Sequence, residues 1–576
     1  MRITSVGHAG LLVETGAGRI LCDPWFNPAF FASWFPFPDN EAMDTAQLHT
    51  AEYLYVSHLH HDHFDAEWLG TRMSKDTVVL LPDYPVRDLR TAMEDLGFRH
   101  FVQTRDLEPT ELHSGVRVMV NALTSPTDGP IGDSALLVDD NGTRILNQND
   151  ARPVDEPRIR EFGPLAGHFL QYSGAIWYPM VYDFPARMKQ TVGRRKRRNG
   201  MTRALNYIEQ YGAEHVFPFA GPPCFLDEEL FHLNDLDGDA SNIFPDQWVF
   251  LDFLREHGVT NTHLLLPGTV ADLGPDRSCR IEQVEEREVA RIRDDRTGYL
   301  RAYQARRADR IRAEKAAWPT TRTDLLAALQ EWVEPLLQHA DRTCAGINGR
   351  VLVEVVDAPD RTSDGTDAPA PASAPAPAPA PAPAEQILFD FLDRRVRRWA
   401  GEECRYRFTL PRPLVERLVA ERCPDWANEL FLSCRFKAAR KGPFNEFVTT
   451  FFASLSTERM SYVEGYYAES EQTEERAGAG DYVVQRLCPH LKADLVRFGS
   501  HRDGVLTCRL HDWEFDLSTG RCLTSDDRKI ISAARVGPPG SDPDLPEIPA
   551  AEIPEAEIPA AEIPEAEIPE AEIPAA

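Results

Sequence analysis

Two short segments near the C-terminus carry cysteine and histidine at a spacing that suits metal binding. One residue separates Cys488 from His490, and after 17 further residues two residues separate Cys508 from His511. Two thiolates can hold one iron of a [2Fe–2S] cluster while two imidazoles hold the other, and the neutral imidazoles raise the reduction potential. The pattern therefore predicts a centre that accepts and passes single electrons. A tetrahedral zinc site is the alternative for the same ligands.

The residues around these ligands resemble Rieske proteins. The stretch HDWEFDLSTGRC, which begins at His511, resembles the segment after the second ligand loop of Rieske ferredoxins and Rieske oxygenases. Rieske proteins of cytochrome complexes carry an extra cysteine in each loop, and neither loop has one here. The resemblance implies a Rieske domain of the electron-delivering class, with Cys488, His490, Cys508 and His511 as cluster ligands.

A second group of metal-binding residue types follows a strand-like segment, YLYVSH. The run from His58 to His63 reads His-Leu-His-His-Asp-His. Imidazole and carboxylate ligands suit zinc, iron or manganese, so the ligand types alone do not choose the metal. A histidine-rich loop without a metal is the alternative.

The spacing His-x-His-x-Asp-His resembles the metallo-β-lactamase superfamily over about residues 1–272, with Asp23 and Asp150 as further matches. In that resemblance two histidines of the motif bind one metal, the aspartate and the last histidine bind a second, and Asp150 lies at the bridging position. The implied metal ligands are His58, His60, Asp62, His63 and Asp150, with Asp62 and Asp150 as the catalytic carboxylates.

Two histidines of the superfamily's usual set are missing. The first is absent from SPTDGPIGDSALL, where Asp128 or Asp133 can replace it, and the second is absent from VFPFAGPPCF. A site richer in carboxylates is closer to non-haem iron, which keeps positions open for O2. Such a centre consumes single electrons, which a zinc hydrolase does not need. We therefore expect mono- or dinuclear non-haem iron, with zinc as the alternative.

A metallo-β-lactamase fold and a Rieske motif in one chain resemble the CMP-N-acetylneuraminate hydroxylase family, and the C-terminal Rieske motif resembles its bacterial branch, which includes UDP-N-acetylmuramic acid hydroxylase. The resemblance implies a monooxygenase that uses O2 to convert the N-acetyl group of a nucleotide-linked amino sugar into N-glycolyl. Its electrons come from NAD(P)H through a reductase or ferredoxin, and the chain has no Gly-x-Gly-x-x-Gly fingerprint of its own. A metal-dependent hydrolase and a non-enzymatic redox protein are the alternatives.

The elements that position these residues predict several domains, because 576 residues exceed one hydrophobic core. Alternating short strands and helical stretches predict a metallo-β-lactamase-like αββα sandwich over 1–275. A helical and α+β middle region follows over 276–475, with an Ala-Pro-rich insertion at 357–385 between two strands that can pair. An all-β Rieske domain at 476–536 precedes a disordered acidic tail at 537–576. The predicted fold class is multidomain, α/β plus α+β plus all-β.

Candidate substrate contacts are harder to recognise. An aromatic stretch after the metal region contains Tyr172, Trp177 and Tyr178, which can wall a sugar site or belong to the core. Arg194 and Arg195 open a run of five basic residues that can bind a diphosphate, dock an acidic ferredoxin or stay solvated.

Charge and composition limit the classes of partner that we expect the protein to bind. Of the net charge of −29, a stretch at 542–576 contributes 11 acidic residues, which leaves −18 for the rest. This balance argues against nucleic-acid and anionic-membrane binding, which need clustered cations. No apolar run spans a membrane, the N-terminus lacks a signal-peptide pattern, and ten cysteines suit free thiols. We expect a cytoplasmic enzyme whose electron crosses within one chain or between subunits of a homo-oligomer.

Overall fold

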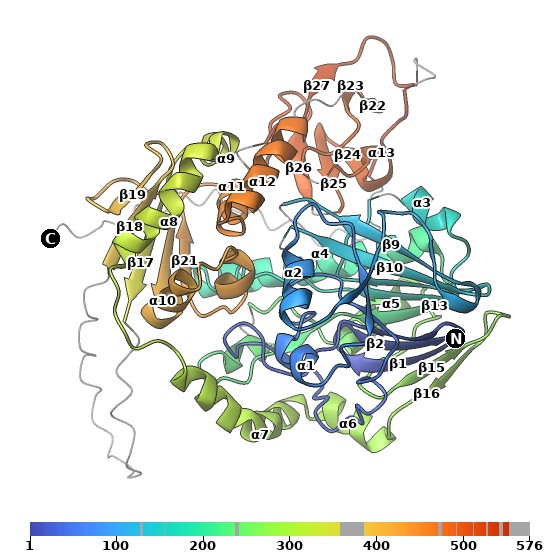
Figure 1. Cartoon of the computed structure of the whole chain (residues 1–576). Coiled ribbons are helices and arrows are strands. Elements are labelled where there is room, and N and C mark those ends of the chain that lie inside the picture. Colours follow the sequence, from blue (N-terminus) through green and yellow to red (C-terminus); the bar gives the residue numbers. More distant parts are fainter. Residues whose placement is uncertain are drawn as a thin grey trace.

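Two packed β-sheets form the N-terminal part of the chain (Figure 1). The computed structural model describes residues 1–126, 131–154, 156–236, 241–357, 385–470, 475–490, 492–510, 512–525, 528–540 and 545–551. The first sheet has the order β16-β15-β1-β2-β3-β5-β6-β7 and the second has the order β13-β12-β11-β10-β9-β8. Their strands are β1 Arg2–Gly7, β2 Gly10–Thr15, β3 Gly18–Cys22, β5 Tyr53–Tyr55, β6 Val78–Leu81, β7 His100–Gln103, β8 Thr110–Glu111, β9 Val116–Leu123, β10 Asp133–Asp140, β11 Thr143–Asn149, β12 Gly167–Gln171, β13 His215–Phe219, β15 Val270–Leu273 and β16 Cys279–Glu282.

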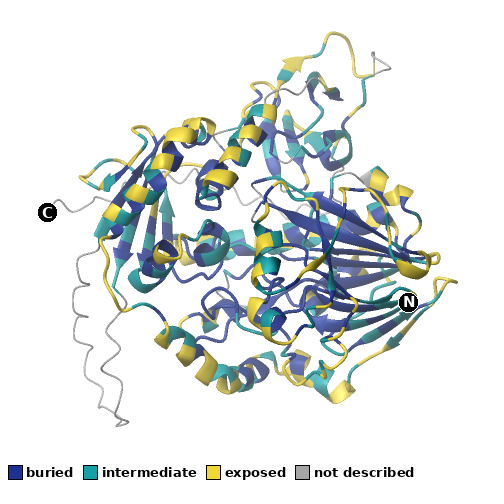
Figure 2. Cartoon of the chain, viewed as in Figure 1, coloured by how far each residue is buried: buried dark blue, intermediate teal, exposed yellow. Residues whose placement is uncertain are grey.

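The facing sides of the two sheets share one apolar core. Val13 of the first sheet and Val118, Phe169 and Phe217 of the second belong to the same buried cluster. Most of these strands are buried along their length and form the dark centre of the sandwich in Figure 2. Near-continuous apolar strands are expected where both faces of a sheet are covered.

Helices cover the outer face of each sheet. Trp68 and Met93, from α1 (Ala66–Thr71) and α2 (Asp88–Asp95), pack on the first sheet. The second sheet is covered by α3 (Glu156–Glu161), α4 (Ala186–Tyr211) and α5 (Gln247–Glu256), which supply Ile159, Tyr207 and Phe250. The layers are therefore α/β/β/α, the metallo-β-lactamase-like sandwich predicted from the sequence. Short elements between the layers are β4 Phe35–Pro36, η1 His113–Gly115, β14 Pro223–Cys224 and η2 Phe231–Asn234.

The middle region begins with two helices that run along the sandwich and continues into a five-stranded sheet of order β19-β18-β17-β20-β21 (Figure 1). β17 and β18, which flank the Ala-Pro segment, pair antiparallel, with Val355 opposite Glu385. The segment itself, 358–384, lies outside the described residues. The elements are α6 Glu286–Asp294, α7 Arg296–Ala316, α8 Leu325–His339, α9 Asp341–Ile347, β17 Arg350–Val356, β18 Glu385–Asp390, β19 Arg395–Arg398, β20 Tyr406–Pro411, α10 Arg412–Ala420, η4 Ala427–Phe431, β21 Lys437–Arg440, α11 Glu446–Phe452 and α12 Thr457–Ser470.

The middle region shares a core with the sandwich. Trp34 and Trp177 of the sandwich belong to the same buried cluster as Phe408 and Phe431. Arg435 reaches across this boundary and donates to the main-chain oxygens of Phe31 and Ala32 at 3.1 Å each. The two parts are therefore packed together as one body.

The C-terminal part contains two three-stranded sheets, β22-β23-β27 and β24-β25-β26. It contacts both other parts: Tyr207 of α4 meets Phe498 with ring centroids 6.3 Å apart, and the Lys492 ammonium lies 4.3 Å from the Tyr466 ring of α12. Its elements are β22 Arg476–Ala479, β23 Tyr482–Gln485, α13 Leu495–Phe498, β24 Gly499–Arg502, β25 Val505–Cys508, β26 Trp513–Asp516 and β27 Ser532–Ala534.

The start of the acidic tail differs from the disorder expected from residue 537 onward. Residues 545–551 are described and lie against the C-terminal sheets, with Ile548 2% exposed. The Gly478 amide donates to Pro546 O at 2.8 Å, and the His501 amide donates to Pro549 O at 3.0 Å. The tail's own composition could not show this, because the partners come from strands far away in the sequence.

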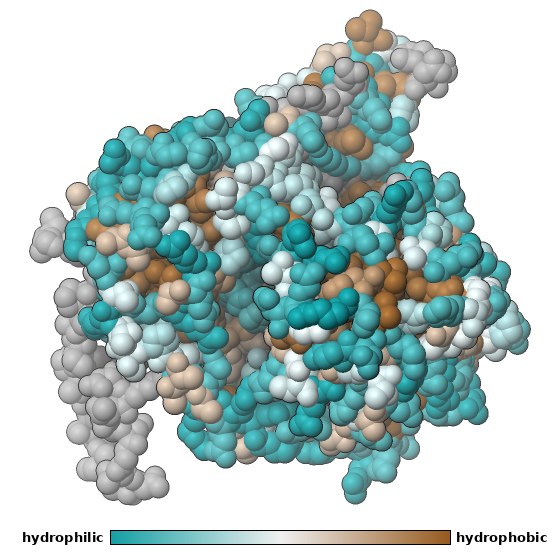
Figure 3. All heavy atoms as spheres, viewed as in Figure 1, coloured by the Kyte–Doolittle hydropathy of each residue, from teal (hydrophilic) through white to brown (hydrophobic). Residues whose placement is uncertain are grey.

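In the described part of the chain, no helix is long and apolar enough to cross a bilayer. Hydrophilic side chains dominate the face seen in Figure 3, with apolar side chains gathered in smaller patches.

Candidate metal centres

The histidine-rich loop follows β5 and is held by buried hydrogen bonds. Asp23 accepts from both the amide and the hydroxyl of Ser57 at 2.7 Å. The Tyr84 hydroxyl donates to Ser57 O, and Asp65 accepts from the Trp68 amide at 2.9 Å and so caps α1 at the end of the loop. These bonds fix the backbone at both ends of the loop, which presents its side chains at one edge of the sandwich.

Two groups of three potential ligands meet at this edge. His58, His60 and Asp150 form one group, and in each group the ligand atoms lie within 4.8 Å of one another. His58 Nε2 lies 2.7 Å from His60 Nδ1. The second group consists of Asp62, His63 and His8, and His8 Nε2 lies 2.9 Å from Asp62 Oδ2.

Asp150 lies between the two groups. Its Oδ2 atom is 3.8 Å from His58 Nε2 and 3.6 Å from His63 Nε2. A single carboxylate that faces a histidine of each group can contact two metal ions. The five metal ligands expected from the sequence are thus brought together.

Carboxylates behind the rings orient two of the histidines. Asp23 Oδ2 lies 3.0 Å from His63 Nδ1, and Asp133 Oδ1 lies 3.3 Å from His58 Nδ1. Such outer partners hold an imidazole so that its other nitrogen faces the metal. Asp133, which the sequence offered as a replacement ligand, stands behind His58 in this way, and Asp128 lies outside the described residues.

Burial and charge act in opposite directions on these groups. Burial lowers the pKa of His63, but the carboxylates of Asp150 and Asp62 outweigh it and raise that pKa to about 10. Burial and the neighbouring His63 and His60 hold the pKa of His58 well below its usual range. The carboxylates around His63 therefore favour positive charge at this position.

The donor set fits a metal ion. Among the described residues, His63 Nε2 and Asp150 Oδ1 are buried without a hydrogen-bond partner. Unpaired buried polar atoms are costly, and a cation would satisfy both. Imidazole and carboxylate ligands suit iron, zinc or manganese.

Sequence reasoning missed His8. It lies in the turn between β1 and β2, about 50 residues before the motif, with φ at +50°. Its ring packs edge-to-face on Trp25 with centroids 4.8 Å apart. The available signal was the sequence Gly-His-Ala-Gly at the end of a strand, since neighbouring strand ends share a sheet edge.

The C-terminal ligand residues lie in two buried loops. Cys488 and Cys508 are 1% and 2% exposed, and Cys508 ends β25 opposite Trp513. The His490 ring stacks on Trp513 with centroids 4.0 Å apart and planes 8° apart. His511 lies outside the described residues. Two thiols and an imidazole from these loops are the donor types that a [2Fe–2S] cluster of this kind needs.

The cluster loop lies close to the Arg152 side chain. Burial lowers the pKa of His490, and the charges of Arg528 and Arg152 lower it further. Arg152 follows the candidate ligand Asp150 by two residues, so the segment that carries Asp150 passes close to His490. Glu446 Oε2 of α11 lies 3.4 Å from His490 Nε2, and Glu446 also forms an ion pair with Arg528.

The candidate substrate residues separate into core and surface positions. Tyr172 is fully buried, with its ring stacked on Phe250 at 4.7 Å, and Trp177 packs on Phe431 at 5.2 Å. Both lie in the core. The sequence had left open whether they wall a sugar site or belong to the core. Tyr178 is only half-buried.

Cations surround Tyr178. The Arg440 guanidinium lies 5.0 Å from the centre of its ring, and the Lys196 ammonium lies 5.8 Å from it. Lys196 reaches solvent, yet the surrounding protein desolvates it and lowers its pKa to about 8, with Arg203 and Arg152 contributing. Sequence reasoning missed Arg203, which lies about two turns from Lys196 on α4, and also Arg440 and Arg152, which come from other elements.

Arg194 and Arg195 are exposed on α4. Arg194 lines a surface groove of about 380 Å³ together with Arg198 and Phe253. Arg195 lies 3.9 Å from Glu514 of β26. These two residues therefore face solvent and the C-terminal part.

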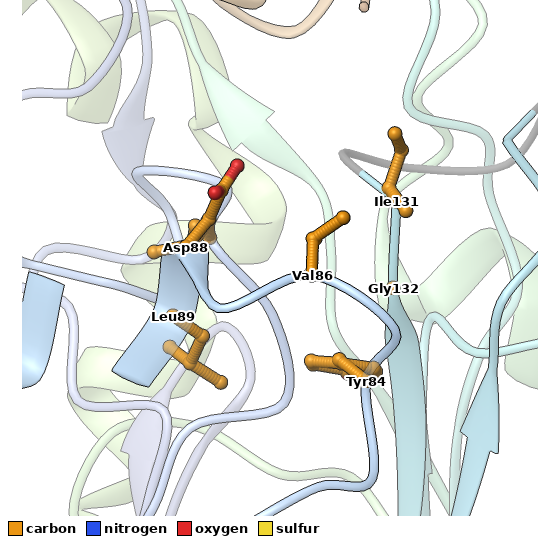
Figure 4. Close-up of a pocket in the computed structure, with 7 residues that line it drawn as sticks. Tyr84, Val86, Asp88, Leu89, Ile131 and Gly132 are labelled. Atoms are coloured by element: carbon orange, nitrogen blue, oxygen red, sulfur yellow. The ribbon is translucent and has the colours of Figure 1, made fainter. Parts of the chain in front are cut away.

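A small cavity lies beside the metal loop (Figure 4). Its volume is about 10 Å³, and Leu59, Tyr84 and Asp88 help to line it. Such a space holds at most about one water molecule, so it is no substrate chamber. Asp88 forms an ion pair of 2.6 Å with Arg459 of α12.

Comparisons with known proteins agree with this arrangement. Residues 325–469 match the family model of the Rv3818-like, SCP2-like domain, and residues 475–533 match the Rieske [2Fe-2S] domain. The sequence patterns alone did not indicate the first of these domains. Fold and site thus define a multidomain Rieske protein with a metallo-β-lactamase-like sandwich.

A protein of Mycolicibacterium smegmatis named as a Rieske 2Fe-2S iron-sulfur protein is 46% identical over 538 residues, which are 92% of this chain and 99% of the relative. The chain belongs to this family of Rieske 2Fe-2S iron-sulfur proteins, and its Rieske domain implies a [2Fe–2S] cluster.

More distant relatives match about half of the chain. Cytidine monophosphate-N-acetylneuraminic acid hydroxylase of Cricetulus griseus is 24% identical over 292 residues, which are 48% of each chain. Among solved structures, CmlA, a diiron β-hydroxylase from Streptomyces venezuelae, is 16% identical with a TM-score of 0.31 and covers 49% of this chain and 54% of its own. The relation to a hydroxylase supports an oxidoreductase.

Proposed function

We propose that the protein is a Rieske-dependent non-haem iron monooxygenase that hydroxylates the N-acetyl group of a nucleotide-linked amino sugar to N-glycolyl. UDP-N-acetylmuramic acid is the substrate to test first. Electrons come from NAD(P)H through a reductase or ferredoxin in the cytoplasm.

One observation carries the proposal: the segment that follows the candidate iron ligand Asp150 reaches the cluster loop of the same chain. Arg152 is near enough to His490 to lower its pKa, and it stands two residues from Asp150. An electron held at the C-terminal loops would pass along this segment to the histidine-rich site. A hydrolase has no need of such a path.

The residues that would hold iron are His58, His60, Asp62, His63, Asp150 and His8, and those that would hold the cluster are Cys488, His490, Cys508 and His511. When bound, iron with open coordination positions supplies O2 activation, and the cluster supplies single electrons. The chain's own part is to orient the ligand rings through Asp23 and Asp133 and to keep the site buried.

The cations around Tyr178 suit the anionic half of a nucleotide sugar. Guanidinium and ammonium groups bind phosphate oxygens through charge-assisted hydrogen bonds. Arg152 belongs both to this group of cations and to the segment that carries Asp150. A substrate whose phosphates contact Lys196 and Arg440 would therefore extend its sugar toward the metal ligands.

The test uses anaerobically purified full-length protein. Iron and zinc are counted per chain, and O2 uptake is followed with reductant, with and without UDP-N-acetylmuramate, while mass spectrometry checks the product for one added oxygen atom. We expect more than two irons per chain and O2 uptake that depends on substrate. The variant His490→Ala should lose the cluster and the oxygenation together.

The zinc count needs a control, because a separate group of three residues near the surface could also bind zinc. The ligand atoms of His215, His263 and Cys279 also lie within 4.8 Å of one another, at the opposite end of β13 from His8. The variant His263→Ala removes one ligand of this second group and so its contribution to the zinc count. Two irons plus zinc in that variant, with no O2 uptake, would point to a hydrolase, and a reducible cluster without a second metal would point to an electron carrier.

A further inference from the structure

The first segment of the acidic tail joins the two sheets of the Rieske domain. Its backbone pairs with Gly478 of β22, where the Gly478 amide donates to Pro546 O and the Ile548 amide donates to Gly478 O, both at 2.8 Å. It also pairs with His501 of β24, whose amide donates to Pro549 O and whose carbonyl accepts from the Ala551 amide, both at 3.0 Å. Two separate sheet edges are thus linked by one strand-like segment.

Two side chains of the tail make specific contacts with the Rieske domain. Glu547 forms an ion pair of 2.7 Å with Arg535, whose side chain is only 4% exposed. Ile548 is 2% exposed and packs beside Gly499. We call the surface formed by Gly478, Gly499, His501 and Arg535 the tail slot.

The slot depends on its two glycines. A Cβ atom on Gly478 would stand 1.6 Å from the Arg535 guanidinium and 2.5 Å from the Glu547 carboxylate. A Cβ atom on Gly499 would stand 3.0 Å from an Ile548 methyl and closer still to the Leu495 carbonyl oxygen. The absence of side chains at these positions lets a Glu-Ile pair approach the backbone closely.

The docked residues are the first copy of a repeat. Glu-Ile-Pro begins at residue 547 and recurs at 552, 557, 562, 567 and 572, with a constant spacing of five residues. The position equivalent to Ala551 is alanine in every unit, and only the residue directly after proline varies, between alanine and glutamate. Every contact that we describe for the first unit uses Glu547, Ile548 or backbone atoms, and all later units supply these.

We propose that the tail slot is a binding site for the Glu-Ile-Pro unit and that each of the six units can occupy it. Backbone pairing with a sheet edge supplies affinity in such complexes, and pockets for single side chains supply specificity. The occupant is the chain's own tail, which exchanges between registers five residues apart. The proposal is independent of the reaction proposed for the metal sites.

Exchange between units changes the free energy of loop closure only slightly. A later unit enlarges the loop that closes back onto the slot, and each doubling of a loop's length changes its closure by only about threefold. Spare units therefore keep the slot filled when one unit leaves. Since Gly499 pairs with the cluster ligand Cys508 across β24 and β25, a filled slot supports the strand pair that carries this ligand.

Hydrogen exchange of the Gly478 and His501 amides tests the proposal in the full-length holoprotein. Three chains are compared: the parent, the single variant Ile548→Asp, and a variant with aspartate replacing the isoleucine of all six units (548, 553, 558, 563, 568 and 573). Exchange in the single variant should be within about threefold of the parent. In the six-site variant it should be at least about tenfold faster, because a charged aspartate cannot fill the apolar recess.

A peptide of residues 552–576 provides a second measurement. Added in excess to the six-site variant, it should slow the exchange of both amides, whereas a matched peptide with aspartate at each isoleucine should not. If the two amides exchange as fast in the single variant as in the six-site variant, the slot binds only the first unit and the proposal is wrong. Failure of the parent peptide to protect either amide would also overturn it. The single variant decides the question even if the six-site chain loses its cluster, because five intact units remain.

Discussion

His61 Nε2 lies 2.8 Å from a carboxylate oxygen of Glu429, and this contact joins the metal loop of the sandwich to the SCP2-like region. The imidazole also stacks on Phe30, with centroids 5.5 Å apart and planes 8° apart. Burial lowers the pKa of His61, but the Glu429 charge outweighs it and raises that pKa. Since His61 stands between His60 and Asp62, the SCP2-like region helps to set the position of two candidate ligands.

Replacing Glu429 with alanine should weaken metal binding at the histidine-rich site. Without its partner, His61 can leave its position and the turn that carries His60 and Asp62 loosens. Changes behind a ligand cost about 10- to 100-fold in metal affinity, and we expect the low end because His61 is not itself a ligand. Competition with a chelator measures the affinity. The matched control is Glu331→Ala on α8, whose carboxylate is 74% exposed, and equal affinities in the two variants would remove the SCP2-like region from this role.

The variant His8→Ala should bind one metal ion fewer at the N-terminal site. His8, Asp62 and His63 form one of the two ligand groups, and the other group does not contain His8. Metal analysis of the purified protein, with the cluster iron determined separately, gives the count. The control His100→Ala changes an exposed histidine on β7. An unchanged number of metal ions in His8→Ala would show that His8 is not a metal ligand.

Affinity for UDP, the nucleotide part of the proposed substrate, should fall as the pH rises through 8. Desolvation by the surrounding protein and neighbouring cations lower the pKa of Lys196 to about 8, so its ammonium is charged at pH 7 and mostly neutral at pH 9. At pH 9 about a tenth of the amine stays protonated, so binding of UDP should be up to about tenfold weaker than at pH 7. The terminal phosphate, whose second pKa is about 6, is already about nine-tenths ionised at pH 7, so its own charge changes little over this range. Calorimetric titration at both pH values measures the change.

Lys196→Arg is the matched variant for this test. A guanidinium keeps its charge at pH 9, so the variant should bind UDP equally well at both pH values. A parallel decline in the parent and the variant would exclude Lys196 as the titrating group.

Arg435→Met should destabilise the contact between the sandwich and the SCP2-like region. The Arg435 side chain is 4% exposed, lies 2.7 Å from Asp227 and donates to two main-chain oxygens. Removing one member of a buried ion pair costs about 3–5 kcal/mol, and we expect the lower value because Lys315 also pairs with Asp227. Thermal unfolding followed by calorimetry should show a lower midpoint. Arg422→Met, which breaks an exposed pair with Glu331, should leave the midpoint unchanged.

Local spacing was sufficient to predict both groups of ligand types. Cys488 with His490, and His58 with His60, are each separated by one residue, so short loops bring their side chains to one place whatever the rest of the fold does. The alternation of strands and helices similarly predicted the layered sandwich, because this pattern has few packed solutions. The same reasoning failed for the tail, where Ile548 finds its recess only on a distant sheet.

The sequence by itself determined which candidate metal ligands the protein carries, since the ligand types and their local spacing depend on neighbours in the chain. Only the tertiary structure decided what lies between the sites. His8 joins Asp62 across 54 residues, Glu429 reaches His61 from another domain, and Arg152 links the segment of Asp150 to His490. Contacts of this kind arise from the packing of separate sheets and helices, and no local pattern in the sequence records them.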